Sequence, residues 1–196
     1  MKPDEGTESL ALDDLGARLR ELRSEKAMTL AELSLLSQVS VAMLSHIERG
    51  QTSPSLKTLE RLRIALGVPL ANFFVRGEMR SGQDDLVVRA NQRSRLQFDK
   101  LGLVKELLSP PGHSGLEVFM LAIEPGGDSG PEPWTRSGEK AGIVLEGRFE
   151  LTVGERVCVL EAGDSFQFDS SQPHRFRNPA SFGTKVVWII SSDAAA

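Results

Sequence analysis

The sequence has few of the residues that form covalent or metal cross-links, with one cysteine and three histidines among 196 residues. A single cysteine excludes an internal disulfide and fits a reducing compartment. Within the alternating stretch RVCVL (156–160) we expect Cys158 to be a small core residue. Long apolar runs are also missing, since VVWII (186–190) is far too short to span a bilayer. The acidic N-terminal stretch lacks the apolar segment of a secretion signal, so we expect a cytoplasmic protein without membrane contacts.

Strong charge of one sign is absent as well. The formal net charge is −4, which does not by itself suggest a nucleic-acid-binding protein. The charge is uneven, because residues 10–76 hold nine basic and seven acidic side chains, an excess of 9 − 7 = +2. Clustering of these residues or dimerisation would still allow a basic face. The sequence contains no internal repeat and no low-complexity tract, so it is typical of a globular chain with one large or two small domains.

Helical periodicity dominates the first third of the chain. Leucines recur at spacings of three and four, Thr29 and Glu32 form a capping box, and Ser40 and Ser55 are further N-cap candidates. Gly50 and Gly67 are natural helix ends. A short segment, PLANFFV (69–75), completes the pattern. We therefore expect a bundle of five helices whose core includes these leucines: Leu15, Leu19, Leu22, Leu33, Leu44, Leu56, Leu59, Leu62 and Leu66.

After Arg76 the pattern changes from helical to alternating. Residues 77–85 are polar and glycine-containing, as expected of a linker. Apolar residues then alternate in several short segments separated by Gly, Pro, Asp and Ser, which predicts many short strands. The predicted architecture is an all-α domain followed by an all-β domain. The expected boundaries are an acidic tail at 1–9, a helical domain at 10–76, a linker at 77–85 and a β domain at 86–196.

The segment MTLAELSLLSQVSVAMLSHIERG (28–50) reads as a helix, a short turn and a second helix. It resembles the helix-turn-helix of the XRE (phage-repressor-like) family, and the resemblance extends from about Leu15 to Phe74. The matching positions are Thr29, Leu33, Val39, Ser40, Leu44, Ser45, Ile47, Glu48 and Gly50, followed by SPSLKTLERLRIALGV (53–68). This resemblance implies a sequence-specific DNA-binding domain. A helical bundle used only for dimerisation is the alternative.

The second helix of this motif would read DNA. If Leu44 and Ile47 face the core, the outer face consists of Ser40, Val41, Ala42, Ser45 and His46. Short apolar side chains such as Val41 and Ala42 suit thymine methyl groups, whereas Ser45 and His46 suit hydrogen bonds to base edges. The phosphate-binding candidates are Thr29, Ser40, Thr52 and Ser53, each of which has a local capping role as an equally good explanation. Since no Arg, Asn or Gln stands at 41, 42 or 45, we expect few bidentate base contacts and a contribution from DNA shape.

Two other positions in the motif have structural implications. Glu48 lies at the end of its helix, where the helix dipole disfavours an acid, and the family resemblance points to Arg23 as its partner. We therefore predict an Arg23–Glu48 pair that fixes the angle between helices. The family usually has glycine where this chain has Gln38, so a left-handed conformation there would cost about 1 kcal/mol or more.

Two stretches of the second half, PWTRSGEKAGIVLEG (133–147) and LEAGDSFQFDSSQPHRFRN (160–178), resemble the two motifs of the cupin barrel. The resemblance covers about Leu86 to Ser191 and implies a double-stranded β-helix, or jelly-roll, fold. Counting back from Gly147 puts the metal-ligand positions of the first motif at Trp134, Arg136 and Lys140. In the second motif Gly163, His174 and Asn178 match, whereas Asp169 and Ser171 replace a proline and a glycine. One metal ligand of four is kept, so we expect no metal and no cofactor.

These replacements would make the pocket cationic. If Arg136 and Lys140 point inward like the ligands they replace, they favour carboxylate, sulfonate or phosphate groups, with Trp134 as an apolar wall and His174 as a third partner. The alternative is that these side chains turn outward or pair with Glu132, Glu139 or Asp169. A two-histidine iron site would have to recruit His113, which we expect to be solvated.

A helix-turn-helix followed by a cupin resembles a class of bacterial transcriptional regulators in which a dimeric barrel senses a small molecule. The resemblance implies a homodimer, a palindromic double-stranded DNA operator and an organic-anion effector. Two alternatives remain: a metal-dependent cupin oxygenase or epoxidase with an attached helix-turn-helix, and a regulator whose barrel only dimerises. No acid–base–nucleophile set is visible, so we expect no catalytic residues.

Overall fold

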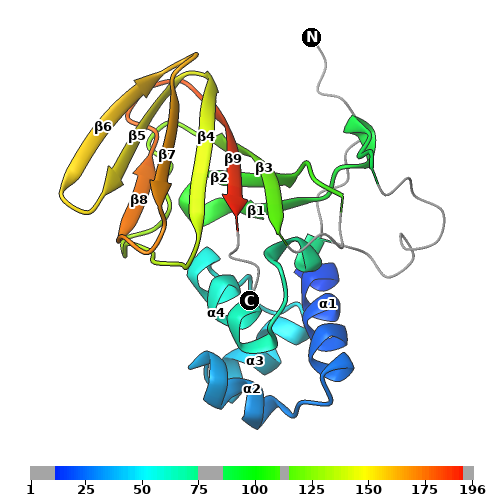
Figure 1. The fold of residues 1–196 in the computed structure, drawn as a ribbon. Coiled ribbons are helices and arrows are strands. Elements are labelled where there is room, and N and C mark those ends of the chain that lie inside the picture. The colour runs from blue at the N-terminus through cyan, green and yellow to red at the C-terminus, as the bar shows by residue number, and fades with distance from the viewer. Residues whose placement is uncertain (1–11, 75–85, 111–114, 192–196) are drawn as a thin grey trace. The chain divides into compact units, whose positions relative to one another are not determined.

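A computed structural model describes residues 12–74, 86–110 and 115–191, with the side chains of 12–14 excepted. The chain forms two compact units, Met1–Arg95 with Pro110–Gly112 and Leu96–Ser109 with His113–Ala196. The first unit is helical and the second is built of strands (Figure 1), which confirms the α-then-β architecture. Residues 86–95 fall with the first unit rather than with the barrel. The expected boundaries of the tail, linker and domains stay predictions.

The described part of the first unit contains four α-helices followed by a short 3-10 helix. The α-helices are α1 (Leu12–Glu25), α2 (Leu30–Ser37), α3 (Val41–Glu48) and α4 (Leu56–Leu66), and the 3-10 helix is η1 (Leu70–Phe74). The prediction of five helices is therefore wrong in its last member. In that segment the Asn72 amide donates to the Pro69 carbonyl at 3.1 Å, an i to i+3 bond. Five residues are too few for a cooperative α-helix, so the tighter turn is kept by burial of its apolar side chains.

The helical core consists of the leucines expected from the sequence. All nine predicted leucines are buried, together with Val39 and Ile47. Thr29, Ser40 and Ser55 are the N-caps of α2, α3 and α4, and each hydroxyl accepts a hydrogen bond from the amide three residues later. Gly16 allows α1 to cross closely over α3, because a Cβ at this position would lie 2.2 Å from the Ile47 carbonyl oxygen.

In the described part of the second unit the strands form two sheets. The larger has the order β1-β2-β3-β9-β4-β7 and the smaller the order β6-β5-β8. Their strands are β1 (Arg95–Phe98), β2 (Leu103–Leu107), β3 (Leu116–Ile123), β4 (Glu139–Glu146), β5 (Arg148–Val153), β6 (Arg156–Glu161), β7 (Ser165–Asp169), β8 (His174–Arg177) and β9 (Thr184–Ser191). The connection between β4 and β5 requires glycine at Gly147, where φ is +85° and a Cβ would lie 2.5 Å from the Thr184 hydroxyl.

An aromatic cluster fills the interior between the sheets. The Trp188 ring lies 5.4 Å from the Phe176 ring and 6.3 Å from the Phe168 ring, centroid to centroid. Phe119 is directly opposite Trp188 in the β3–β9 register, and Gly142 is opposite Trp188 on the other side. Alternation in β3 buries Glu117, Phe119, Leu121 and Ile123 on this inner face. The inner face is therefore mostly apolar. Charged side chains such as Glu117 interrupt it where alternation turns them inward.

The position of Cys158 differs from the expectation. Its side chain is exposed, although it is directly opposite the buried Leu151 of β5. The reason is that β6 is an edge strand of the small sheet, so its residues are covered from one side only. Alternation identified the strand correctly, but alternation does not reveal which strand lies at an edge.

No single helix among residues 12–74 and 86–95 has the length and apolar composition to cross a membrane. Helices α2 and α3 reach that composition only when taken together, as a pair bent by 115°.

Candidate DNA-reading helix and barrel site

The angle between α2 and α3 is the defining geometry of the first unit. The two helices meet at 115° across a three-residue turn, Gln38 to Ser40. Perpendicular helices joined by so short a turn are the geometry of a helix-turn-helix, in which the second helix enters the major groove of DNA. Gln38 has φ 56° and ψ 29°, so a glutamine occupies the left-handed position that usually takes glycine. Gln38 therefore adopts the left-handed conformation that the family resemblance implied for this position.

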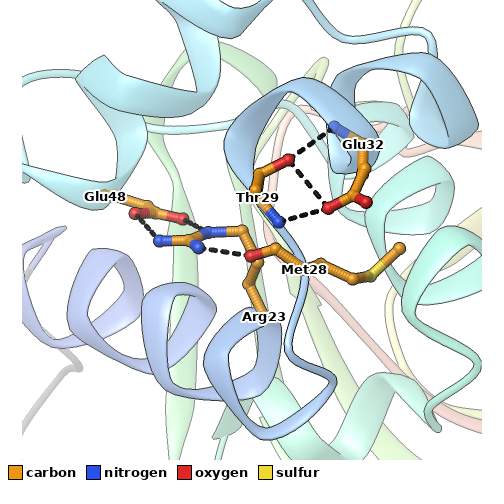
Figure 2. A network of polar contacts seen from close by, with 5 residues as sticks. All are labelled: Arg23, Met28, Thr29, Glu32 and Glu48. Carbon is orange, nitrogen blue, oxygen red and sulfur yellow. Dashed lines mark hydrogen bonds and ion pairs between the residues drawn. The ribbon is translucent and has the colours of Figure 1, made fainter.

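A bidentate ion pair fixes α3 against α1 (Figure 2). The Arg23 guanidinium donates from Nε to Glu48 Oε1 at 2.7 Å and from Nη2 to Glu48 Oε2 at 3.0 Å. Its third nitrogen donates to the Met28 carbonyl at 2.7 Å, at the start of α2. Both side chains are largely buried, at 15% and 7% exposure. The hydrogen bond to Glu48 raises the pKa of Arg23 above its usual value, so the guanidinium stays charged. The predicted Arg23–Glu48 pair is confirmed.

The outer face of α3 exposes most of the residues expected there. Val41 is 44% exposed, Ala42 and His46 are exposed, and Ser45 is half-buried. Leu44 and Ile47 face the core, at 0% and 1% exposure. Val41, Ala42, Ser45 and His46 share one accessible face of α3, and Val41 and Ala42 lie at its N-terminal end, where a recognition helix contacts base edges.

The four phosphate candidates are held differently. The Thr29 hydroxyl accepts from the Glu32 amide at 3.2 Å and also donates to the Glu32 carboxylate at 2.8 Å, so it takes part in a closed capping box (Figure 2). The Ser40 hydroxyl accepts from the Met43 amide at 3.2 Å and keeps its own proton for another acceptor. Thr52 is half-buried and Ser53 exposed, both in the loop between α3 and α4. Ser40 and Ser53 are therefore better suited than Thr29 to contact a phosphate.

In the barrel, the four residues expected to line a pocket come together inside the sheets. Arg136, Lys140 and His174 are buried at 8%, 3% and 2% exposure. Trp134 is half-buried and exchanges two backbone hydrogen bonds with His174, so the loop before β4 runs beside β8. The Lys140 ammonium lies 5.5 Å from the Trp134 ring centroid and 5.6 Å from that of Trp188. Arg136 and Lys140 therefore do not turn outward.

Two partners of this cluster fix its chemistry. Arg136 Nη2 donates to Glu117 Oε2 at 3.1 Å, and both side chains are nearly inaccessible. Lys140 Nζ lies 2.6 Å from His174 Nε2, and His174 Nδ1 lies 2.8 Å from the Gln172 carbonyl oxygen. A carbonyl only accepts, so Nδ1 carries a proton and donates to it, and Nε2 shares a hydrogen bond with the Lys140 nitrogen. His174 thereby orients the Lys140 side chain.

Glu139 and Asp169, considered from sequence as alternative partners, make other contacts. Glu139 accepts from Gln167 Nε2 at 2.9 Å. Asp169 accepts from the Ser171 amide at 2.8 Å, and this hydrogen bond lowers the pKa of its carboxyl. Asp169 and Ser171, which replace proline and glycine of the cupin motif, thus form a local turn.

Comparisons with known proteins agree on both units. A helix-turn-helix family model matches residues 19–73 and a cupin domain model matches residues 119–190. The transcriptional regulator ClgR of Mycobacterium tuberculosis is 32% identical over 87 residues, which are 44% of this chain and 78% of ClgR. The chain is an XRE-family helix-turn-helix regulator with a cupin domain.

Two further comparisons extend along nearly the whole regulator. The HTH-type transcriptional regulator PuuR of Escherichia coli K12 is 29% identical over 177 residues, covering 88% of this chain and 91% of PuuR. A crystal structure of an HTH_3 family transcriptional regulator from Vibrio cholerae covers 92% of this chain and 96% of its own, with a TM-score of 0.73 and 23% identity. Both relatives span the helical and the barrel part, so the regulator shares their two-domain organisation.

The barrel of this XRE-family regulator contains two charged residues that the motifs did not identify. Lys105 in β2 is 3% exposed, with its ammonium 3.9 Å from the Phe119 ring centroid, and Glu117 in β3 is the partner of Arg136. Both lie upstream of the two cupin motifs. The alternation in GLVKELL (102–108) was a signal for β2, because Leu103, Lys105 and Leu107 share a face.

The inner face of the regulator's barrel holds charge of both signs. Lys105, Arg136 and Lys140 are buried cations of this face, and Glu117 is a buried carboxylate on it. Glu106 is also buried, but alternation places it on the other face of β2, opposite Met120.

The donor set of this face does not fit a metal ion. In the described residues no group of three or more His, Cys, Asp and Glu side chains is placed to hold one. The metal-ligand positions of the cupin motif carry Trp134, Arg136 and Lys140, and Nε2 of the remaining imidazole, His174, is already hydrogen-bonded to Lys140. His113 lies outside the described residues. Asn178, the last motif position, ties loops together, since its amide donates to the carbonyls of Ile123, Glu124 and Phe182.

Proposed function

We propose that this regulator acts as a cytoplasmic homodimer that reads a palindromic operator with α3 of each protomer and senses an organic anion inside its barrel. DNA-binding transcriptional regulation follows from family membership. The observation that supports α3 as the reader is the exposed outer face of a helix held at 115° to α2 by the Arg23–Glu48 pair. Two such helices related by a dimer axis would suit half-sites about one helical turn apart.

The reading face is tested with a combined Ser45→Ala and His46→Ala variant. These side chains are the hydrogen-bonding groups on the outer face of α3, so we expect specific operator affinity to fall at least tenfold, at about 1–3 kcal/mol per base contact. Fluorescence anisotropy at one fixed salt concentration measures binding to the selected operator and to a scrambled duplex. Ser165→Ala, an exposed serine of β7, is the matched control. Unchanged discrimination between the two duplexes would refute this reading face.

The anion proposal is supported by the burial of three cations on one face of the barrel. In this low-dielectric interior an anionic ligand would accept charge-assisted hydrogen bonds from the guanidinium and ammonium groups. The Arg136 fork suits a planar carboxylate or a phosphate, and Trp134 and Trp188 provide apolar walls beside Lys140. The effector would shift the population of dimer arrangements that fit DNA. A barrel that only dimerises is the competing explanation.

A thermal-shift panel separates these explanations. Acetate, benzoate, succinate and inorganic phosphate are each added to the full-length protein, and the melting temperature is compared with that in chloride of equal ionic strength. We expect at least one organic anion to raise the melting temperature, and Arg136→Ala to abolish that rise. Arg148→Ala, which removes an exposed guanidinium paired with Glu161, should leave the rise intact. If no anion stabilises the protein, or the Arg136→Ala variant responds equally, the barrel is structural.

The proposal assigns no catalytic residue and no metal. Elemental analysis of the purified protein tests for a bound metal. Stoichiometric iron, manganese, nickel or zinc in the purified protein would contradict it and favour a metal-dependent cupin enzyme.

A further inference from the structure

The first turn of α3 presents a continuous apolar surface to solvent. Val41 is 44% exposed and Met43 is 45% exposed, and the exposed Ala42 lies between them. Single exposed apolar residues are common, but three in succession at the N-terminal end of a reading helix form a contact surface in the place where bases are read.

The orientation of this surface follows from the contacts on the other side of the helix. Leu44 and Ile47 are buried and Glu48 is paired with Arg23, so the rotation of α3 about its axis is fixed. At about 100° per residue, Ala42 is about 200° from Leu44 and about 140° from Ile47. Ala42 therefore points directly away from the core, and Val41 and Met43 flank it on either side.

Hydrogen-bonding groups are displaced from this turn. The Ser40 hydroxyl accepts a hydrogen bond from the Met43 amide, which orients the hydroxyl toward the N-terminal end of α3. Ser45 and His46 lie one turn further along α3. Val and Ala have no side-chain group that pairs with a donor or acceptor of a base, and the Met thioether is only a weak acceptor. In the major groove, the apolar group that such side chains can contact is the C5-methyl of thymine.

We propose that the first turn of α3 recognises thymine through its 5-methyl group, with Val41 and Ala42 in contact and Met43 closing one side. This inference rests on the proposed function of α3 as the reading helix. At the base pairs that face the first turn, specificity then comes from the methyl group of thymine. Hydrogen bonds to base edges are made by Ser45 and His46.

The test uses four versions of one operator. The full-length protein first selects its operator from a pool of random duplexes. Each thymine of a half-site is then replaced, symmetrically in both half-sites, by uracil, by 5-methylcytosine paired with guanine, or by cytosine paired with guanine. Uracil removes only the methyl group, and 5-methylcytosine keeps the methyl group while changing the hydrogen-bonding edge. Affinities are measured by anisotropy at one salt concentration.

We expect the methyl group to decide affinity at the base pairs facing the first turn. One buried methyl corresponds to about fourfold, so symmetric replacement by uracil should weaken binding about fifteenfold. We expect operators with thymine or 5-methylcytosine at these positions to bind with higher affinity than operators with uracil or cytosine. The inference is overturned if the thymine and uracil operators bind with equal affinity at every position. It is also overturned if both bind more tightly than the cytosine and 5-methylcytosine operators, because the protein then reads the hydrogen-bonding edge of the base.

A variant locates the methyl contact on the protein. Val41→Ala shortens an exposed side chain and favours the helix, so folding is preserved. We expect the thymine-to-uracil affinity ratio to fall toward one, with little change in affinity for the uracil operator. Val157→Ala, at an exposed valine of β6, should leave the ratio unchanged. An undiminished ratio in Val41→Ala would overturn the assignment to Val41. If the pool yields no enriched sequence, the proposed function itself fails, and the inference fails with it.

Discussion

At the scale of single residues, charged groups with fixed partners organise both units. Arg23 and Glu48 set the crossing of α1 and α3, and Arg136 and Glu117 occupy the interior of the barrel. Each guanidinium was found from the sequence, but the two carboxylates were not equally visible. Glu48 lies in a motif with fixed spacing, whereas Glu117 is 19 residues from Arg136 and meets it only through the pairing of strands.

Arg23→Ala should destabilise the helical unit strongly. It leaves the largely buried Glu48 carboxylate without its bidentate partner, which costs about 3 kcal/mol. Helical circular dichroism during urea unfolding measures the change. Arg148→Ala, which removes an exposed pair, should cost less than about 1 kcal/mol. Equal costs for the two variants would mean that the Arg23–Glu48 pair behaves as a surface pair.

Gln38→Gly should stabilise the same unit. The residue has a φ of 56°, where a side chain is strained and glycine is not. We expect an increase of about 1 kcal/mol in the free energy of unfolding, measured by urea titration. Gly67→Gln is the reciprocal comparison at another left-handed helix end, with φ 63°, and should destabilise by a similar amount. A destabilised Gln38→Gly variant would contradict this explanation.

At the scale of elements, helix ends were readable from sequence because caps are local. Thr29, Ser40 and Ser55 precede their helices with the three-residue spacing that brings each hydroxyl to an amide. Strands were predicted less completely, since β1, β2 and β8 have only four or five residues each. The edge position of β6, which exposes Cys158, is likewise a property of the sheet and not of the strand.

The capping box of α2 should make helix stability depend on pH. Hydrogen bonds from the Thr29 amide and hydroxyl lower the pKa of the Glu32 carboxyl below its usual value. A carboxyl with a lowered folded pKa stabilises the protein above its unfolded pKa, and this contribution is lost as pH falls through the folded pKa. Glu32→Gln keeps a capping acceptor but does not titrate.

The comparison is made by urea unfolding of both proteins between pH 7 and pH 3. We expect the wild type to lose its advantage over Glu32→Gln as the pH falls through the acidic range. A constant difference between the two proteins at every pH would contradict the role of the ionised carboxylate.

At the scale of the whole molecule, the proposed regulation of DNA binding by an anion in the barrel requires a reciprocal coupling between the two sites. If an anion bound in the barrel changes operator affinity by some factor, operator DNA must change anion affinity by the same factor. We expect calorimetric titrations of the anion, with and without saturating operator, to give that factor, and Arg136→Ala to reduce it to one. Unequal factors would mean that the anion also binds the DNA or a second site.

The sequence by itself determined the elements whose causes are local: the helical period, the caps, the turn at Gln38, and the motif spacings that placed Arg23, Glu48, Arg136, Lys140 and His174. The tertiary structure alone decided which of these groups meet. Glu117 and Lys105 join the barrel cluster through β2 and β3, and His174 lies between the Lys140 side chain and the Gln172 carbonyl. Local spacing encodes the orientation of a side chain along its own element. Charge balance inside a barrel depends on strand pairing across long sequence separations, and only the folded chain fixes that pairing.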